Sequence, residues 1–310
     1  MKKCVAVDLG GTTAKMGIVG EDGTVFEKWE IPTRKEANGK YILEDIAASA
    51  KEHLALAAIS EEDFAGVGIG VPGPVEADGY VEVLVNLGIR DMNPANELSK
   101  LMGGINVKVA NDANVAALGE QWMGSGKGFD SVMFFTLGTG VGGGLIIDGQ
   151  IVAGSAGMAA EVGHFPMNLD EPDTCNCGGH GCLEQYASAT GIVKEMKRLL
   201  AKTDEACVLR GKEFSCKDVL DAAKSGDKLA HENMVHCMEY LARAMAYIAY
   251  TCNPAVFVLG GGVSKAGDYL VDLVKDRFAF LTPLTSKKAA IRIASLQNDA
   301  GMFGAAKLVL

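Results

Sequence analysis

The sequence predicts an α/β fold that contains a duplicated strand unit. Two glycine-rich stretches resemble each other, one beginning at Val5 and the other at Val132. Each is typical of an apolar strand, a Gly/Thr loop, a second apolar strand, an Asp-Gly turn and a third strand. Between and after them, strand and helix patterns alternate along the chain, as they do in α/β proteins.

The residues after each glycine loop decide which phosphate-binding architecture the chain can form. In dinucleotide-binding and Walker-type units the glycine loop opens a helix. Here Asp22-Gly23 and Asp148-Gly149 are hairpin signals that follow a short strand, which excludes both architectures. A tight turn between two strands can still offer backbone N–H groups to phosphate oxygens. We therefore expect two hairpins, facing each other, that hold the phosphates of a nucleotide from both sides.

Further segments show helix or strand patterns, and no low-complexity linker separates them. In chain order they are a helix at 41–59, a strand and Pro/Gly loop at 64–75, a strand, polar junction and helix at 106–124, a long helix at 228–253, a strand and glycine loop at 254–264, a helix at 268–281 and an apolar segment at 289–296 before a final helix. We place a first lobe at residues 1–116 and a larger lobe at 117–296. The final helix, about residues 297–310, is a candidate to return to the first lobe.

Composition narrows the classes of partner. The chain has 310 residues, 48% of them hydrophobic, and a formal net charge of -10, which argues against broad nucleic-acid binding. The apolar run near the N-terminus is interrupted at Asp8, and no stretch is long enough to span a membrane. We therefore expect a cytoplasmic protein that binds neither nucleic acid nor membrane. Five of the eight cysteines stand alone and are interpreted as core or incidental residues: Cys4, Cys207, Cys216, Cys237 and Cys252.

The glycine-rich loops are the candidate nucleotide site. A single glycine loop is more often only a turn, but the duplication favours a phosphate-binding role. Asp8, at the end of a strand beside the first loop, would suit magnesium through water. The Gly260–Gly262 loop offers a surface for an adenosine group. The nucleotide candidates are Asp8, Gly10, Gly11, Thr12, Thr13, Gly138, Thr139, Gly140, Gly261 and Gly262.

The motif NDAN, at residues 111–114, lies where a strand gives way to a helix. Asn and Asp at such a place are ordinary helix caps. The carboxyl end of a strand in an open α/β sheet is also where ligands bind, so Asp112 could accept a proton from a substrate hydroxyl. Downstream, Glu161 and His164 are three residues apart and would share one face of a helix.

The segment CNCGGHGCLE, which begins at Cys175, indicates a metal-binding site. Cys175, Cys177 and Cys182 supply three thiolates that suit zinc, and one nitrogen ligand would complete a tetrahedral site. His180 lies between two of the cysteines and His164 lies upstream of them. Spacing alone does not choose between these two histidines.

These motifs resemble those of the ROK family, which comprises sugar kinases and related repressors. The segment CNCGGHGCLE is similar to the family's zinc motif, and residues 140–164 are similar to its signature. DLGGT, VPGPV, NLG, NDAN and GGGVS follow in the family's order, so the resemblance covers essentially the whole chain. The motifs are most similar to those of the bacterial glucokinases.

The resemblance implies an actin-like ATPase (ribonuclease H-like) duplicated fold, with two α/β lobes around a cleft. It implies ATP-dependent phosphorylation of the 6-hydroxyl of glucose, giving glucose 6-phosphate and ADP, by a homo-oligomer (dimer or tetramer). Another hexose or an N-acylhexosamine (N-acetylmannosamine, N-acetylglucosamine, fructose or mannose) is the alternative acceptor. A sugar-sensing repressor is the other alternative, but such repressors usually carry a DNA-binding module ahead of the kinase-like region, whereas here Asp8 opens the first hairpin.

The resemblance also implies roles for individual residues. Asp112 would be the general base. His164 would complete the zinc site through one ring nitrogen and face the sugar with the other, so that zinc is structural and Mg²⁺ accompanies ATP. Glucokinases of this type often carry an aromatic residue where this chain has Ile89. The sugar-binding candidates are Gly73, Asn86, Asn111, Asp112, Glu161, His164 and Glu184, and the metal ligands are His164, Cys175, Cys177 and Cys182.

Overall fold

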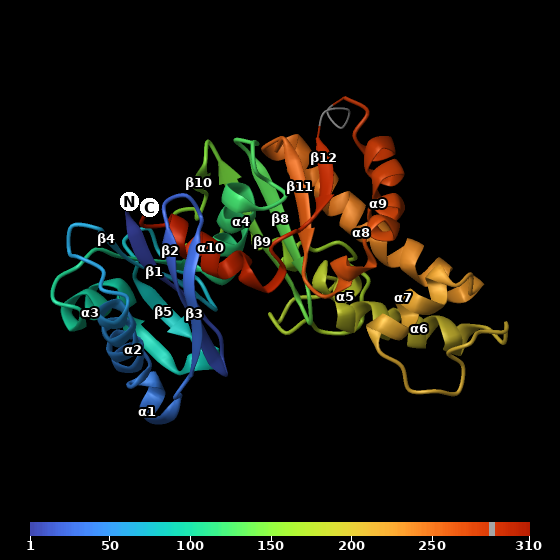
Figure 1. Cartoon of the computed structure of the whole chain (residues 1–310). Helices are drawn as coiled ribbons and strands as arrows, with labels where there is room; N and C mark the ends of the chain where they lie inside the picture. Colours follow the sequence, from blue (N-terminus) through green and yellow to red (C-terminus); the bar gives the residue numbers. More distant parts are fainter. Residues whose placement is uncertain (285–288) are drawn as a thin grey trace. The chain divides into compact units, whose positions relative to one another are not determined.

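The computed structural model describes residues 1–284 and 289–310, and the chain divides into two compact units. Unit 1 comprises Met1–Asp130, Gly144–Ala160 and Ser295–Leu310, and unit 2 comprises Ser131–Gly143 and Glu161–Ala294. Figure 1 labels the helices and strands. The division into lobes at residue 116 stays a prediction.

Unit 1 is built on a five-stranded sheet with the order β3-β2-β1-β4-β7. The first three strands form antiparallel hairpins, and the last two run parallel to β1. The predicted succession of strand, glycine loop, strand, turn and strand is therefore confirmed for the first repeat. The strands are β1 (Lys3–Leu9), β2 (Thr13–Gly20), β3 (Val25–Pro32), β4 (Phe64–Val71) and β7 (Val107–Asn111).

The two faces of β1 are covered by different helices, because successive side chains of a strand point to opposite faces. Val7 belongs to the core that includes α2 (Ile42–Leu56). Its neighbour Ala6 belongs to the core that includes α10 (Ala300–Lys307). Burial on both faces explains why β1 is apolar over most of its length.

The helix α10 packs closely on α4 (Asp112–Met123) through glycines. A Cβ on Gly119 of α4 would lie 2.1 Å from the carbonyl oxygen of Ala300, and one on Gly304 of α10 would lie 1.6 Å from the carbonyl oxygen of Val115. Backbones can approach so closely only where no side chain intervenes. This contact holds the final helix within unit 1.

Unit 1 also contains elements that no sequence pattern indicated. The NLG motif lies in a short hairpin, where η1 (Val85–Leu87) joins two strands. Asn93 caps α3, since its side-chain oxygen accepts a hydrogen bond from the backbone N–H of Asn96. These elements are α1 (Glu36–Gly39), β5 (Val81–Leu84), β6 (Ile89–Met92) and α3 (Pro94–Leu101).

The second sheet has the order β10-β9-β8-β11-β12, which repeats the order of the first. Again three strands, β8, β9 and β10, come from one glycine-rich stretch. The other two, β11 and β12, run parallel to β8. The match confirms the duplication, and the protein has the actin-like ATPase fold. The strands are β8 (Val132–Leu137), β9 (Val141–Ile147), β10 (Gln150–Ile151), β11 (Val256–Gly260) and β12 (Ala290–Ile293).

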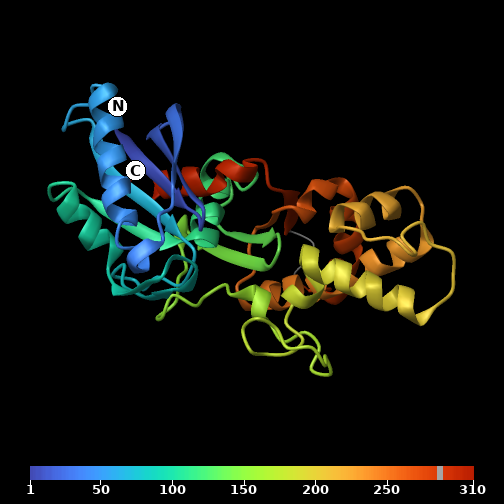
Figure 2. The same cartoon turned by 90° about the horizontal axis from the view of Figure 1, so that it is seen from below.

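Most helices of the chain's second half lie in unit 2. The predicted helices at 228–253 and 268–281 are confirmed, but the first ends two residues earlier than predicted. Figure 2 shows an irregular segment in yellow-green followed by α5 and α6, which no sequence pattern indicated. The helices are α5 (Glu184–Ala187), α6 (Ala189–Lys202), α7 (Cys216–Lys224), α8 (Lys228–Thr251) and α9 (Asp268–Leu281), with 3-10 turns η2 (Val162–His164) and η3 (Val263–Ala266).

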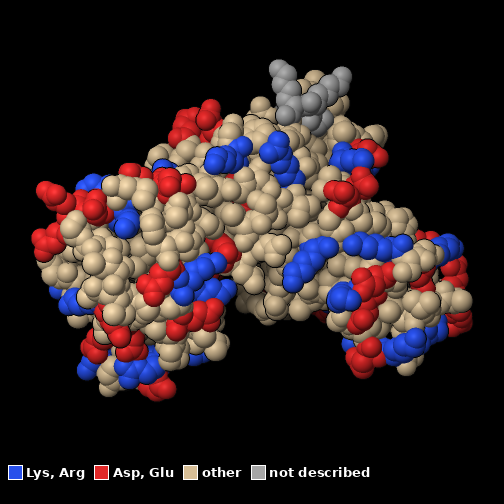
Figure 3. All heavy atoms as spheres, in the orientation of Figure 1, with Lys and Arg blue, Asp and Glu red and all other residues tan. Residues whose placement is uncertain are grey.

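Over the described residues, every helix is too short or too polar to cross a bilayer. On the face that Figure 3 shows, acidic and basic side chains are interspersed. Both features agree with a chain of formal net charge -10 and mixed composition.

Candidate functional site

Asn111 organises the junction between β7 and α4. Its side-chain oxygen accepts hydrogen bonds from the backbone N–H groups of Ala113 (3.0 Å) and Asn114 (3.1 Å), so it is the N-cap of α4. Its amide nitrogen donates to the carbonyl oxygen of Gly73 (3.2 Å). The structure thus brings two of the predicted sugar-binding residues, Asn111 and Gly73, into contact.

Asp112 is the first residue of α4, and it is exposed. Its Oδ1 accepts a hydrogen bond from the backbone N–H of Ala113 (2.8 Å), which orients the carboxylate at the helix end. Because the residue follows directly on a parallel strand, it lies where ligands bind in open α/β sheets. An exposed carboxylate there can accept a proton from a bound hydroxyl.

The first glycine turn joins β1 to β2 and is fastened to residues after β3. The backbone N–H of Gly10 donates to the carbonyl oxygen of Thr13 (3.0 Å). The hydroxyl of Thr33 donates to the carbonyl oxygen of Gly10 (2.8 Å), and its N–H donates to that of Thr12 (2.9 Å). Among the described residues, no atom fills the space where a side chain of Gly11 would stand. The turn is therefore held on one side and open beside Gly11.

Asp8 lies near the end of β1, next to α10. A Cβ on Gly301 of α10 would lie 2.8 Å from Cγ of Asp8, so the helix backbone lies directly against the carboxyl group. Burial raises the pKa of Asp8, and Lys15, its partner across the β1–β2 hairpin, opposes the shift. Sequence reasoning missed Gly301, because a glycine in a final helix carries no signal of this contact.

The second glycine turn packs against the start of α6. The N–H of Gly138 donates to the carbonyl oxygen of Gly140 (2.9 Å), and the carbonyl oxygen of Gly138 accepts from the N–H of Ala189 (2.8 Å). The hydroxyl of Thr190 donates to the carbonyl oxygen of Thr139 (2.7 Å). The position of this turn therefore depends on α6.

The third glycine stretch lies beside the same strand end. Gly261 has φ +81°, and a Cβ on it would lie 2.6 Å from the backbone of Leu137, the residue before Gly138. Only glycine combines this conformation with so close an approach. The structure therefore brings Gly261 next to the second glycine turn.

Three cysteines and a histidine gather in unit 2. The ligand atoms of His164, Cys175, Cys177 and Cys182 all lie within 4.8 Å of one another. The sulfurs of Cys177 and Cys182 are 3.6 Å apart, and that of Cys175 is 4.0 Å from Nδ1 of His164. Zn–S bonds of about 2.3 Å give a tetrahedral site with edges of roughly 3.8 Å. The donors and their spacing fit a four-coordinate zinc ion.

The three thiols differ in acidity. Burial, reinforced by the neighbouring thiols of Cys177 and Cys175, raises the pKa of Cys182 to about 12. Burial also raises the pKa of Cys175, whereas the N–H of Gly179 lowers that of Cys177. Thiolates held this close repel one another, and a divalent cation would offset that repulsion.

The two candidate histidines occupy different places. His180 has its Nδ1 3.1 Å from the carbonyl oxygen of Glu171, whereas His164 lies with the three cysteines. Glu161 and His164 do not share a helix face: Glu161 is the N-cap of η2, a single 3-10 turn, and its carbonyl oxygen accepts from the N–H of His164 (3.1 Å). Burial raises the pKa of Glu161, and His164 opposes the shift.

Glu184, the first residue of α5, links the cysteine cluster to the second glycine turn. Its Oε2 accepts a hydrogen bond from the backbone N–H of Val141 (2.9 Å). The thiol of Cys175 donates to its Oε1 (3.8 Å). Sequence reasoning predicted a sugar-binding carboxylate here and missed the contact with the turn, because the two partners are far apart in the chain.

The NLG hairpin carries Asn86 and packs against Gly73. Asn86 is exposed in η1, and a Cβ on Gly73 would lie 2.7 Å from Cδ2 of Leu84. Ile89 is only 3% exposed and belongs to the unit 1 core, beside Gly39. The position at which glucokinases often carry an aromatic residue therefore faces the core here.

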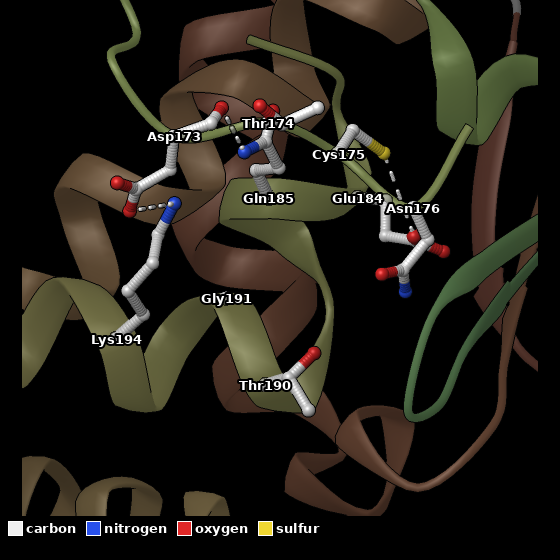
Figure 4. A pocket seen from close by; sticks show the side chains of 9 residues that line it. All are labelled: Asp173, Thr174, Cys175, Asn176, Glu184, Gln185, Thr190, Gly191 and Lys194. Carbon is white, nitrogen blue, oxygen red and sulfur yellow. Dashed lines mark hydrogen bonds and ion pairs between the residues drawn. The ribbon is translucent and has the colours of Figure 1, made fainter. Parts of the chain in front are cut away.

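A pocket of about 390 Å³ lies between the cysteine-bearing segment and the start of α6. Figure 4 shows the side chains of Asp173 and Lys194 directed toward each other on one side of it, with Cys175 and Glu184 on another. No sequence pattern indicated this pocket. Its lining residues are Asp173, Thr174, Cys175, Asn176, Glu184, Gln185, Thr190, Gly191 and Lys194.

Comparison with known proteins gives consistent results. The family model described as "ROK family" matches residues 4–310. A glucokinase of Halalkalibacterium halodurans is 41% identical over 98% of this chain and 94% of its own length, and one of Thermotoga maritima is 35% identical over 99% and 97%. The crystal structure of a ROK family glucokinase from Streptomyces griseus, in complex with glucose and AMPPNP, has a TM-score of 0.74 and 33% identity, covering 99% of each chain. The protein belongs to the ROK family.

Proposed function

We propose that this protein is a glucokinase, an ATP-dependent kinase that transfers a phosphoryl group to the 6-hydroxyl of glucose. The observation that carries the proposal is the likeness to glucokinases over nearly the whole chain, 41% identity in one case. The Streptomyces griseus structure, whose description names glucose and AMPPNP, supports a sugar and ATP as the small-molecule partners.

We propose Asp112 as the general base. Phosphoryl transfer to an alcohol requires the hydroxyl proton to be accepted as the oxygen attacks, and a carboxylate can do this. The exposed carboxylate of Asp112, oriented by the N–H of Ala113, supports the assignment. Asn111, Glu161, His164 and Glu184, with Gly73 and Asn86, are proposed to bind the sugar.

The glycine turns are proposed to hold the phosphates of ATP. Open space beside Gly11 and the fastened backbone around it support this role for the first turn. The contacts of Thr139 and Gly140 with α6 and Glu184 support it for the second. Mg²⁺ bound with ATP would neutralise charge on the phosphates, and Asp8 is its proposed neighbour. The remaining proposed nucleotide residues are Gly10, Thr12, Thr13, Gly138, Gly261 and Gly262.

We propose that His164, Cys175, Cys177 and Cys182 hold a structural zinc ion. Four protein ligands leave no open coordination position, so the metal would hold the loop rather than act on the phosphate. The mutual distances of the four ligand atoms support this assignment. A homo-oligomer and a cytoplasmic location also stay predictions, and light scattering of the purified protein tests the first.

The test is a coupled ADP-release assay with magnesium-ATP and a panel of sugars: glucose, mannose, fructose, N-acetylglucosamine and N-acetylmannosamine. We expect a strong preference for glucose. Asp112→Asn should lower kcat by about 100-fold or more while leaving glucose binding intact. Glu52→Gln, which neutralises an exposed carboxylate on α2, is the matched control and should behave like the parent.

Three other results of this assay would change the assignment of the substrate, the base or the activity. Preference for an N-acyl sugar would keep the mechanism and change the substrate. Turnover of Asp112→Asn near that of the parent would remove Asp112 from its assigned role. An absence of turnover with every sugar would contradict the kinase assignment and favour a sugar-binding regulator of the same family.

A further inference from the structure

The segment at residues 165–183, which we call the cysteine loop, has its two arms joined by backbone contacts. The N–H groups of Met167 and Asn168 both donate to the carbonyl oxygen of Gly181 (2.8 and 3.1 Å). The N–H of Leu183 donates to the carbonyl oxygen of Phe165 (2.9 Å). Gly181 has φ +66°, and a Cβ on it would lie 1.6 Å from the carbonyl oxygen of Asn168. Backbone hydrogen bonds therefore close the base of the loop, and the side chains of the cysteine ligands take no part in them.

Glu171, in one arm of this loop, is a buried carboxylate surrounded by donors. Its side chain is 1% exposed. Arg198 donates to both of its oxygens (2.9 and 2.6 Å), and the hydroxyl of Tyr186 donates to one of them (2.5 Å). Lys194 lies 3.5 Å away. Bidentate Arg–carboxylate pairs add geometric specificity as well as interaction energy, so the carboxylate of Glu171 has one well-defined position.

The basic partners of Glu171 come from α6. Arg198 also donates to Asp173 (2.6 Å) and to Glu195 (2.8 Å). Figure 4 shows Lys194 directed toward Asp173, at 3.8 Å. Because Asp173 lies two residues before Cys175, the first of the three cysteine ligands, Arg198 and Lys194 hold the segment that leads into the metal cluster.

Tyr186 extends the same network to α5, the helix that begins with Glu184. Its hydroxyl accepts a hydrogen bond from the side-chain amide of Asn168 (2.8 Å) while it donates to Glu171. Its ring is buried and stacks on that of Tyr240 in α8, with centroids 3.9 Å apart. The position of Glu184 is therefore coupled to the same carboxylate that anchors the loop.

A buried ion pair is weak evidence for stability, because desolvation of two charges offsets much of their attraction. Its geometric effect is better supported, since a network with every member hydrogen-bonded favours one arrangement. Glu171, Tyr186, Lys194 and Arg198 satisfy this condition, and we call them the α6 clamp. The clamp touches none of the four zinc ligands through the hydrogen bonds that define it.

We propose that the α6 clamp positions the cysteine loop and Glu184 for sugar binding, in addition to and independently of the zinc ion. Glu171, Tyr186, Lys194 and Arg198 are then positioning residues rather than catalytic ones. The inference rests on the proposed function, because it assigns these residues to the sugar side of the kinase reaction.

The test compares Arg198→Met and Arg198→Lys in the full-length, zinc-loaded protein. We expect Arg198→Met to raise KM for glucose about 10-fold or more, as is typical when a supporting partner of a site is removed. KM for ATP should change less than KM for glucose, and zinc should stay bound at the parental ratio, measured by mass spectrometry of the metal. Arg198→Lys keeps the charge but loses the two-pronged geometry, so it should fall between.

Arg277→Met is the matched control, because Arg277 of α9 pairs with Glu239 of α8, outside the clamp. It should leave KM for glucose unchanged. If Arg198→Met fails to fold, the double variant Glu171→Gln/Arg198→Met replaces it, since removing both charges leaves neither buried alone. Glucose KM at the parental value in a folded variant would overturn the proposal, and loss of zinc from Arg198→Met would overturn the claimed independence from the metal.

Hydrogen exchange separates failure of the clamp from failure of the kinase assignment. We expect faster amide exchange at residues 165–187 in Arg198→Met than in the parent, with other parts of unit 2 unchanged. This readout needs no sugar turnover, so it still tests the clamp if the parent phosphorylates none of the sugars. Unchanged exchange in that segment would contradict the clamp even if the protein is a glucokinase.

Discussion

The carboxylate of Glu184 accepts a hydrogen bond from the backbone N–H of Val141, at 2.9 Å. This contact requires glycine at position 140, because a Cβ there would lie 2.1 Å from Oε2 of Glu184. A residue predicted to bind sugar and a turn predicted to bind phosphate are thus in direct contact within unit 2. Changes at either position should therefore affect the other.

Gly140→Ala should destabilise the protein by about 1–3 kcal/mol, because the added methyl group displaces the carboxylate. The double variant Gly140→Ala/Glu184→Ala should lose less stability than the sum of the two single variants, since the clash is gone. Urea unfolding of all four proteins measures the coupling. Strict additivity would show that the turn and Glu184 are independent.

Cys177→Ser should lower the zinc content and weaken glucose affinity, because one of four ligands is lost and the loop end is freed. Cys207→Ser is the control, since Cys207 stands apart from the cluster. Metal analysis and glucose titration measure both effects. A zinc-free Cys177→Ser protein with the parental glucose affinity would separate the metal from the sugar site.

His164→Ala and His180→Ala should differ in zinc content. His164 lies with the cysteine sulfurs, whereas Nδ1 of His180 lies 3.1 Å from the carbonyl oxygen of Glu171. We expect zinc to be weakened in the first variant and retained in the second. Equal retention in both variants would mean that His164 is not a ligand.

Glu171 should make stability depend on pH in the acid range. The Arg198 guanidinium holds the pKa of this carboxyl well below its ordinary value of 4.5. A carboxyl group whose pKa is lower in the folded state than in the unfolded state stabilises the fold when the pH is above its unfolded-state pKa. This contribution is lost as the pH falls toward the folded-state pKa.

The difference in unfolding free energy between the parent and Glu171→Gln should therefore be largest near neutral pH and shrink as the pH falls below about 4. Urea unfolding across this range measures it. A difference that stays constant from neutral to acid pH would contradict the role of the ion pair.

Local sequence patterns predicted most strands of the two five-stranded sheets and the helices α2, α4, α8 and α9. β1 and β8 are recognisable because they are apolar and end at glycine turns, and the β7–α4 junction because Asn111 caps a helix. Both signals lie within a few residues of the element that they specify. The resemblance to the ROK family added the full fold and the choice of His164 over His180.

The contacts that were not predicted are those between distant segments. Arg198 and Glu171 meet only because α6 packs beside the cysteine loop, and nothing in either local pattern reports this. The hairpin β5–β6 was also missed, since its strands are only four residues long and alternate weakly. Tertiary packing decides such features.

The close packing of α10 against α4 and β1 has a consequence for synthesis on the ribosome. Gly68 of β4 also lies against α10, where a Cβ would be 1.8 Å from the carbonyl oxygen of Ala305. The face of β1 that carries Cys4 and Ala6 therefore stays uncovered until residues 300–307 have been synthesised. Most of unit 2 lies in the chain between the first and the last segment of unit 1. A nascent chain therefore exposes this apolar face while unit 2 is being synthesised.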